Sequence, residues 1–202
     1  MAPDDESRRL AAGADDLLAS LRSFARLEDA VADFDAVVAT SSLRGREEQR
    51  FLSLAELPAF LSEIGPEARL AFVFGPERSG LTEEERARAS ACLRLPTRPD
   101  FPTLNVSHAV AVVLGAVRAF EPEGKPSGEI EWAPAGDIEG AIEHWDRALD
   151  AIGFYDTGHR ERSLRDWRRI MAGRPLSRRD LAILHGVANR VLVALKLRDG
   201  EP

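Results

Sequence analysis

Apolar and polar positions along the chain predict strands and helices in turn. Three short, almost wholly apolar runs end in polar or proline-containing loops, which is typical of buried parallel strands; they cover residues 36–39, 70–74 and 92–95. Around them apolar residues recur at helical spacing, which predicts helices over residues 14–24, 28–34, 54–64, 83–91 and 105–120. This alternation predicts an α/β domain with a parallel sheet, although three strands would make a small one.

The second half of the chain follows a different pattern. The predicted helix 105–120 is apolar nearly all round, so we expect it to be buried on more than one side. The next segment is rich in glycine and proline, which predicts a linker over residues 121–137. Three further helices are predicted at 138–152, 163–171 and 177–197. The sequence therefore predicts a domain over residues 1–120, the linker, and a helical extension over residues 138–202.

Composition restricts the setting of the protein. The chain has 202 residues, of which 44% are apolar and 30% charged, as in folded soluble proteins. A single cysteine, Cys92, excludes an internal disulfide and a cysteine-rich zinc site, which favours a reducing compartment. The acidic N-terminus does not resemble a signal peptide, and no apolar run is long enough to span a bilayer. We therefore expect a cytoplasmic protein without a membrane segment.

Charge is distributed unevenly along the chain. The net charge is −7, which disfavours nucleic acid as a partner of the chain as a whole. Residues 151–202, however, carry 11 basic and 6 acidic residues, whereas residues 1–150 carry 16 basic and 28 acidic ones. If a polyanion binds, the C-terminal quarter is the better candidate for its contact surface.

The first segment that could carry chemistry covers residues 74–82, Phe-Gly-Pro-Glu-Arg-Ser-Gly-Leu-Thr. A buried strand leads into a turn with two glycines, which let backbone approach a ligand closely, and with the carboxylate of Glu77. The turn opens a polar helix that Thr82 is expected to cap. The alternative is an ordinary connection between a strand and a helix. The turn is not a phosphate-binding P-loop, because Leu81 stands where that motif requires lysine.

The second segment covers residues 93–107, Leu-Arg-Leu-Pro-Thr-Arg-Pro-Asp-Phe-Pro-Thr-Leu-Asn-Val-Ser. A predicted strand is followed by a proline-rich loop and by a helix that carries Asn105 and Ser107 in its first turn. Taken alone, this segment is better explained by helix capping through Thr103 or Asn105.

Together the two segments resemble the second and third motifs of the SPOUT-class RNA 2′-O-ribose methyltransferases, the SpoU/TrmH group. Within that class, the form Leu-Pro-Thr-x-Pro-Asp-Phe-x-x-Leu-Asn looks most like the TrmJ-type tRNA methyltransferases. Residues 12–18 are similar to the segment before that family's second helix, and residues 153–186 to its helical C-terminal extension. The resemblance implies a parallel sheet with a C-terminal trefoil knot, in which the chain threads through an earlier loop.

The resemblance also implies a cofactor, S-adenosyl-L-methionine, held in the knot largely by backbone groups from three loops. Carried over by position, the cofactor-binding residues are Thr40, Ser41, Ser42, Gly75, Leu95, Pro102, Thr103 and Leu104. Asn105 matches the family's motif-three asparagine near the methyl-transfer centre, and we expect it and Glu77 to be catalytic. All three loops follow the carboxyl ends of predicted parallel strands, where open α/β sheets bind ligands.

The implied activity is methylation of a ribose 2′-hydroxyl in RNA, with tRNA as the expected substrate. One departure from the family favours an alternative, a catalytically inactive remnant that binds only cofactor or RNA. Family members begin with a strand and an Asn-x-Gly-Ala-x-x-Arg motif, whose arginine acts in the methyl-transfer centre, and this sequence lacks it. Met1 falls where the family's second strand ends. We therefore expect roughly two strands and a helix to be missing, through a late start codon or a true truncation.

For several other residues the sequence allows a purely structural role as well as a functional one. Arg168 and Arg169 are expected either to form a solvated helix face or to contact the RNA backbone. The exposed apolar surface of helix 105–120, like the family resemblance, predicts a homodimer, and His108 is expected in core packing or in that interface. The other three histidines are isolated in sequence, so we expect no metal site; they are His144, His159 and His185.

Overall fold

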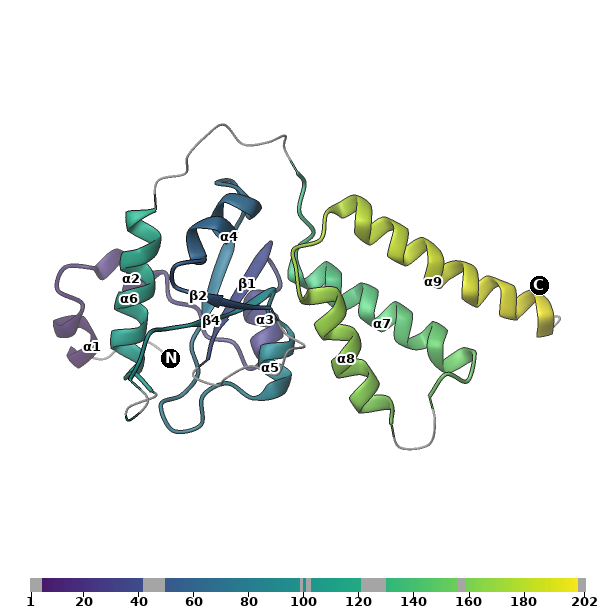
Figure 1. Cartoon of the computed structure of the whole chain (residues 1–202), viewed down its shortest axis with the longest axis horizontal. Coiled ribbons are helices and arrows are strands. Elements are labelled where there is room, and N and C mark those ends of the chain that lie inside the picture. Colours follow the sequence, from purple (N-terminus) through teal and green to yellow (C-terminus); the bar gives the residue numbers. More distant parts are fainter. Residues whose placement is uncertain are drawn as a thin grey trace.

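The computed structural model describes residues 5–41, 50–98, 100, 103–120, 130–155 and 159–199. These residues form an α/β unit followed by three helices (Figure 1). The sheet is parallel and has the strand order β2-β4-β1-β3. Its strands are β1 (Ala36–Thr40), β2 (Phe51–Ser53), β3 (Leu70–Val73) and β4 (Ala91–Arg94). The predicted α/β class with a parallel sheet is therefore confirmed.

The two central strands are the most deeply buried elements. In β1, Val38 pairs with Phe72 of β3 on one side and with Ala91 of β4 on the other. Val38 and Ala91 have no exposed surface. A strand covered on both faces needs apolar residues at its buried positions, and this explains why residues 36–39 of β1 and 91–93 of β4 are all apolar.

Helices cover both faces of the sheet. On one face, α4 (Leu57–Ile64) and α6 (Val106–Ala119) pack against β1 and β4, and Phe60 is the largest side chain of the core there. On the other face lie α3 (Leu27–Val31) and α5 (Glu83–Ala87). Figure 1 shows α6 and α4 on the side of the sheet away from the three C-terminal helices.

Several elements differ from those that the sequence predicts. The edge strand β2 has no counterpart among the predicted strands, so the described sheet has four strands rather than three. In the N-terminal segment, α1 (Asp5–Leu10) is likewise additional, and α2 (Asp15–Ala19) ends five residues before the predicted helix 14–24 does. A short helix with no buried residue has little packing to extend it.

The expectation that α6 is buried on more than one side is wrong for the single chain. Ala109 and Val113 are buried, whereas Val112 is 38% and Leu114 is 56% exposed. His108 is also exposed, so it does not pack into the core of this chain. One side of the helix therefore presents an apolar face to its surroundings.

The C-terminal helices form a second packed layer. They are α7 (Ala135–Ala151), α8 (Arg160–Ala172) and α9 (Arg178–Asp199), and α7 contacts both of the others. Trp145 of α7 stacks on Trp167 of α8 with ring centroids 5.6 Å apart. The start of α9 is capped, because the Asp180 amide donates to the Ser177 hydroxyl at 3.1 Å and the Asp180 carboxylate accepts from the Ser177 amide.

Backbone hydrogen bonds attach α7 to the α/β unit. The Ala135 amide donates to the Phe34 carbonyl at 2.8 Å, and the Gly136 amide donates to the Ala32 carbonyl at 2.9 Å. A side chain at Gly136 would place its Cβ only 3.2 Å from the Cβ of Ala32. The glycine therefore permits the close approach of α7 to the end of α3.

Two predictions about chain organisation remain predictions. The trefoil knot depends on loops that include residues 42–49, 99, 101 and 102, which lie outside the described residues. The same holds for most of the predicted linker, residues 121–129. Of the predicted boundaries of the extension, the structure shows only that α7 begins at Ala135, three residues before the predicted start.

Candidate functional site

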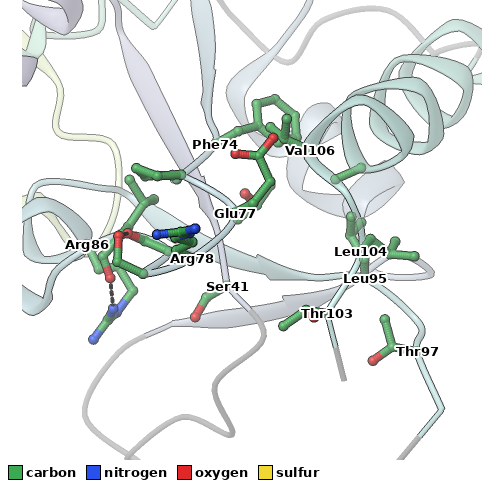
Figure 2. A pocket seen from close by; sticks show the side chains of 17 residues that line it. Ser41, Phe74, Glu77, Arg78, Arg86, Leu95, Thr97, Thr103, Leu104 and Val106 are labelled. Carbon is green, nitrogen blue, oxygen red and sulfur yellow. Dashed lines mark hydrogen bonds between the residues drawn. The ribbon is translucent and has the colours of Figure 1, made fainter. Parts of the chain in front are cut away.

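A pocket opens at the carboxyl ends of β1, β3 and β4. It has a volume of about 240 Å³ and is formed by the loops that follow these three strands, together with the start of α6. Figure 2 shows its side chains, with Ser41, Leu95, Leu104 and Thr103 placed around one opening. This is the edge at which parallel α/β sheets bind ligands.

Most of the residues predicted to bind the cofactor are brought together here. The residues of that set that line the pocket are Thr40, Ser41, Gly75, Leu95, Thr103 and Leu104. They come from three loops far apart in the sequence, and the parallel pairing of the strands aligns them. The two remaining members, Ser42 and Pro102, lie outside the described residues.

The loop after β3 is a tight turn that requires glycine at two positions. Gly80 has a φ of +63°, a region that side chains disfavour, and its amide donates to the Pro76 carbonyl at 2.8 Å. A Cβ on Gly75 would lie 2.4 Å from both the Gly80 carbonyl carbon and the Leu81 nitrogen. The loop therefore folds back on itself so closely that Gly75 cannot accept even a methyl group without backbone movement.

The turn leads directly into α5. The Thr82 side chain accepts a hydrogen bond from the Glu85 amide, and the Glu85 carboxylate accepts one from the Thr82 amide. This capping box fixes where the helix begins, and it confirms that Thr82 caps the helix. The helix in turn fixes the end of the pocket loop.

The lining combines hydroxyl and backbone groups with apolar side chains. Leu95 and Leu104 stand on one side of the pocket, and Leu104 is 38% exposed. The Thr40 hydroxyl donates to the Val73 carbonyl at 3.1 Å, which ties the ends of β1 and β3 together. The Ser41 amide donates to the Leu93 carbonyl at 3.1 Å, which does the same for β1 and β4.

Three charged residues also line the pocket: Glu77, Arg78 and Arg86. In Figure 2 the Glu77 carboxylate points toward Phe74 and the start of α6, whereas the two arginines lie on the side away from Leu95. Arg86 donates to the Leu81 carbonyl, so its guanidinium is held against the pocket loop. The sequence alone did not indicate a role for either arginine, although Arg78 lies within segment 74–82 and Arg86 lies one helical turn after it.

The pocket fits the implied cofactor by its chemistry. Apolar walls suit an adenine ring, hydroxyl and backbone groups suit a ribose, and the Glu77 carboxylate suits a ligand that carries positive charge. S-adenosyl-L-methionine has these three features, so the residues present match it.

Asn105 has a defined structural role at the mouth of the pocket. Its side-chain oxygen accepts hydrogen bonds from the Ser107 amide at 2.9 Å and from the Ser107 hydroxyl at 2.6 Å, which caps α6. It stands in the chain between two lining residues, Leu104 and Val106, but does not itself line the cavity. The capping explanation offered by the sequence is thus realised, and a catalytic role of Asn105 stays a prediction.

The predicted RNA-binding arginines have carboxylate partners. The Arg168 side chain is 17% exposed and pairs with Glu139 at 2.7 Å, so it is not part of a solvated face. Arg169 pairs with Asp166 at 3.4 Å. Contact of either residue with RNA stays a prediction, and the sheltered ion pair gives Arg168 a structural role that the sequence did not show.

Two histidines expected to be isolated meet in space. The Nδ1 atoms of His144 and His185 lie 2.9 Å apart, at hydrogen-bonding distance between α7 and α9. Burial, followed by the charges of His185 and Arg147, lowers the pKa of His144. Among the described residues no cluster of three or more metal-binding side chains occurs.

The single cysteine is an unreactive core residue. Cys92 has no exposed surface, and burial raises the pKa of its thiol to about 11, so it is protonated at neutral pH.

In the part of the chain that the structure describes, no helix combines the length and apolar character needed to cross a membrane.

Comparison with known proteins places both parts of the chain. Residues 2–115 match the SpoU rRNA Methylase family, and residues 136–200 match the family described as tRNA methyltransferase TrmJ, C-terminal domain. These ranges correspond to the α/β unit and to the three C-terminal helices.

Individual relatives agree over most of the chain. A Serratia marcescens protein named uncharacterized tRNA/rRNA methyltransferase LasT is 34% identical, over 89% of each chain. The TrmJ of Klebsiella pneumoniae, named a tRNA (cytidine/uridine-2′-O-)-methyltransferase, is 30% identical, and the match covers 92% of this chain and 79% of that one.

The fold itself is also known. The crystal structure of TrmJ from Z. mobilis superposes with a TM-score of 0.76 at 26% identity, and the match covers 94% of this chain and 81% of that chain. The resemblance that the sequence motifs suggested is thereby confirmed. The chain belongs to the SpoU rRNA methylase family, as a member with a TrmJ-type C-terminal extension.

Proposed function

We propose that this protein transfers the methyl group of S-adenosyl-L-methionine to a ribose 2′-hydroxyl of tRNA. The observation that carries the proposal is the pocket at the carboxyl ends of β1, β3 and β4, which gathers six of the predicted cofactor residues from three loops. Membership of the SpoU methylase family supports the reaction, and the tRNA 2′-O-methyltransferase name of the Klebsiella pneumoniae relative supports the substrate.

The residues of the pocket divide the work of binding. S-adenosyl-L-methionine supplies, when bound, a methyl group on a positively charged sulfur that is a good leaving group. Leu95 and Leu104 can pack against the apolar surface of the cofactor. The backbone of the turn between Gly75 and Gly80 offers it hydrogen-bonding groups. Because these contacts come from a rigid turn and from strand ends, the cavity is largely formed before any ligand arrives.

Glu77 is the candidate for activating the ribose hydroxyl that accepts the methyl group. A ribose hydroxyl is too weakly acidic to be ionised at neutral pH, so its attack requires a group that polarises it or accepts its proton. The Glu77 side chain lines the cavity, and a carboxylate is an acceptor at neutral pH. Asn105, one residue from the lining, is the candidate for orienting the ribose through its amide nitrogen, since its oxygen already caps α6.

Transfer of a tritiated methyl group from the cofactor to acid-precipitable tRNA tests the proposal. Incubated with the whole chain, tRNA should become labelled, whereas a DNA oligonucleotide should not, because it has no 2′-hydroxyl. Glu77→Gln keeps the shape of the side chain and removes its charge, so it should lower turnover at saturating cofactor, and it should also weaken cofactor binding because the carboxylate no longer faces the positive charge of the ligand. A chain that binds the cofactor but labels no RNA would contradict the proposal and favour the binding-only alternative.

We infer that the protein acts as a homodimer assembled through α6. The helix exposes Val112 and Leu114, which supports a second copy as the partner of this face. The same helix carries Val106 and Ala109, which line the pocket, so the second copy would lie near the site.

Sedimentation of the chain at micromolar concentration tests the homodimer. The expected species has twice the mass of the 22.2 kDa chain, and Leu114→Glu, which places a charge in the apolar face, should shift it to the monomer. Glu131→Gln, at an exposed position outside α6, is the control and should not change the mass. A parent chain that sediments only as a monomer would refute this assembly.

A further inference from the structure

One carboxylate joins the α/β unit to the helical extension. The Oε2 atom of Glu139, on α7, lies 2.9 Å from the Arg88 guanidinium, and its Oε1 atom accepts two hydrogen bonds from Arg168 at 2.9 and 2.7 Å. Arg88 directly follows α5, and Arg168 belongs to α8. Three elements, from both parts of the chain, therefore meet at Glu139.

The network is sheltered from solvent and continues into α3. The exposed fractions are 11% for the Arg88 side chain, 17% for Arg168 and 23% for Glu139. Arg88 also lies 3.6 Å from Glu28 of α3 and 3.9 Å from Glu84 of α5. Burial opposes the charge of Arg168, yet its hydrogen bond with Glu139 and the charge of that carboxylate hold the pKa of the guanidinium above its usual value.

Ion pairs of this kind define geometry more than they add stability. Removing charges from water costs about as much as their attraction returns, so the net contribution of a buried pair to folding is small. The planar guanidinium of arginine, however, donates paired hydrogen bonds to a carboxylate in only a few orientations. A carboxylate shared by two arginines from different elements therefore restricts how those elements sit relative to each other.

The network is connected to the pocket through α5. The helix is five residues long, begins at the end of the pocket loop, and carries Arg86, which lines the pocket. Arg88 stands two residues further on. On the other side of Glu139, α8 exposes Arg162 and Arg165, for which no carboxylate lies at ion-pair distance among the described residues.

We propose that Glu139 is a positioning residue that holds α8 in one orientation relative to the pocket. In this way the exposed arginines of α8 can bind tRNA phosphates while the target ribose reaches the pocket. The tRNA part rests on the proposed function. Glu139 itself does not line the pocket, and it lies on α7 rather than among the exposed residues of α8.

The orientation is measured directly by the distance between two spin labels. Glu67→Cys after α4 and Glu161→Cys on α8 place labels at exposed positions in the two parts of the chain. Cys92 will not compete, because it is fully buried and burial raises the pKa of its thiol to about 11. With Glu139 present, we expect a single narrow distance distribution; with Glu139→Gln, we expect a broad or displaced one.

Asp137→Asn is the matched control. Asp137 lies two residues earlier on α7 and pairs with Arg178 at 3.4 Å, so its ion pair stays within the extension. It should leave the distance distribution unchanged. If Glu139→Gln lowered the melting temperature but kept the narrow distribution of the parent, Glu139 would have only a structural role, and the proposal would be wrong.

Binding of tRNA provides a second readout. If Glu139→Gln leaves about a tenth of the molecules aligned, the apparent Kd for tRNA rises about tenfold. The KM for tRNA should rise equally, whereas kcat at saturating tRNA and the Kd for S-adenosyl-L-methionine should not change. An unchanged tRNA affinity would overturn the positioning role. A parent chain that neither binds nor methylates tRNA would instead refute the proposed function, and the spin-label distance would still decide what Glu139 holds.

Discussion

Gly75 is the residue at which a single methyl group should most disturb the pocket. Gly75→Ala places a Cβ 2.4 Å from two backbone atoms of the same loop, so the loop must open. Crowding of this kind costs about 1–3 kcal/mol, which corresponds to a loss of cofactor affinity of about 5- to 150-fold. Calorimetric titration with S-adenosyl-L-methionine measures the loss.

Gly140→Ala is the control for this substitution. Gly140 lies on the exposed side of α7, where an added Cβ would have no atom within 4 Å, and alanine favours a helix over glycine. This variant should bind the cofactor as the parent does and be equally or more stable. Cofactor affinity that survives Gly75→Ala would show that the turn does not contribute to the binding site.

The pair formed by His144 and His185 predicts a dependence of stability on pH. Because the pKa of folded His144 is below the usual value of 6.5, the unfolded chain binds more protons in the range between the two values. Stability should therefore be constant above about pH 6.5 and fall as the pH decreases below it. The free energy of unfolding, measured in urea between neutral and mildly acidic pH, should show this decrease.

Substitution of both histidines separates this effect from general acid unfolding. His144→Gln with His185→Gln should remove most of the decrease just below about pH 6.5. His159→Gln, at the start of α8, should keep it. If the double variant loses stability over this range as steeply as the parent, the titrating group lies elsewhere in the chain.

At the residue scale, the sequence predicts loop residues better than ion pairs. The family resemblance assigned Gly75 and Leu95 to one site, and the pattern supported this because each follows a strand and parallel strands end at the same edge of a sheet. The partner of Arg168 could not be assigned, because Glu139 lies 29 residues away on another helix and only the packing of α8 on α7 brings the charges together.

At the element scale, predictability followed burial. Strands β1 and β4 are covered on both faces over residues 36–39 and 91–93, and all of these residues are apolar. Edge strand β2 has three residues, of which only Leu52 is buried, and such a short segment carries no pattern. In the opposite sense, Leu17 and Leu21 recur at helical spacing but are 65% and 66% exposed, and α2 ends between them.

Helix α8 gives a prediction about tRNA binding. Arg162 and Arg165 are exposed, so each can neutralise a phosphate, whereas Arg168 is already paired. In Arg162→Ala/Arg165→Ala, the plot of log affinity against log salt should be flatter by about 1.4–1.8, or about 0.7–0.9 for each phosphate that is no longer neutralised. Filter binding of tRNA from low to physiological salt measures both slopes.

Glu161 and Arg168 provide the comparison on the same helix. Glu161→Gln removes an exposed negative charge and should leave the slope unchanged or make the affinity slightly higher. Arg168→Ala should lower stability, because it leaves the sheltered Glu139 with one arginine fewer. If the double arginine variant keeps both the affinity and the slope of the parent, α8 does not contact the RNA backbone.

At the scale of the whole molecule, the structure combines an acidic α/β unit that carries the pocket with a helical extension whose last two helices, α8 and α9, are basic. The charge asymmetry was evident from the sequence, as was the predominance of helix after residue 137. The placement of the extension was not, because it depends on backbone contacts such as that of Gly136 with Ala32 and on the side-chain hydrogen bond from Trp132 to the Ile64 carbonyl. These contacts have no signature in a single sequence.

The central claim of the proposed activity is that the methyl group is transferred to a ribose of tRNA. The most direct measurement is mass spectrometry of nucleosides from tRNA that has been incubated with the chain and with S-adenosyl-L-methionine carrying a deuterated methyl group. We predict label on the ribose of one or a few nucleosides and, at a cofactor concentration below the Kd of the variant, much less label in a Gly75→Ala control, in which the pocket loop is displaced. Label found only on bases, or equal ribose labelling by the control, would contradict the proposed activity.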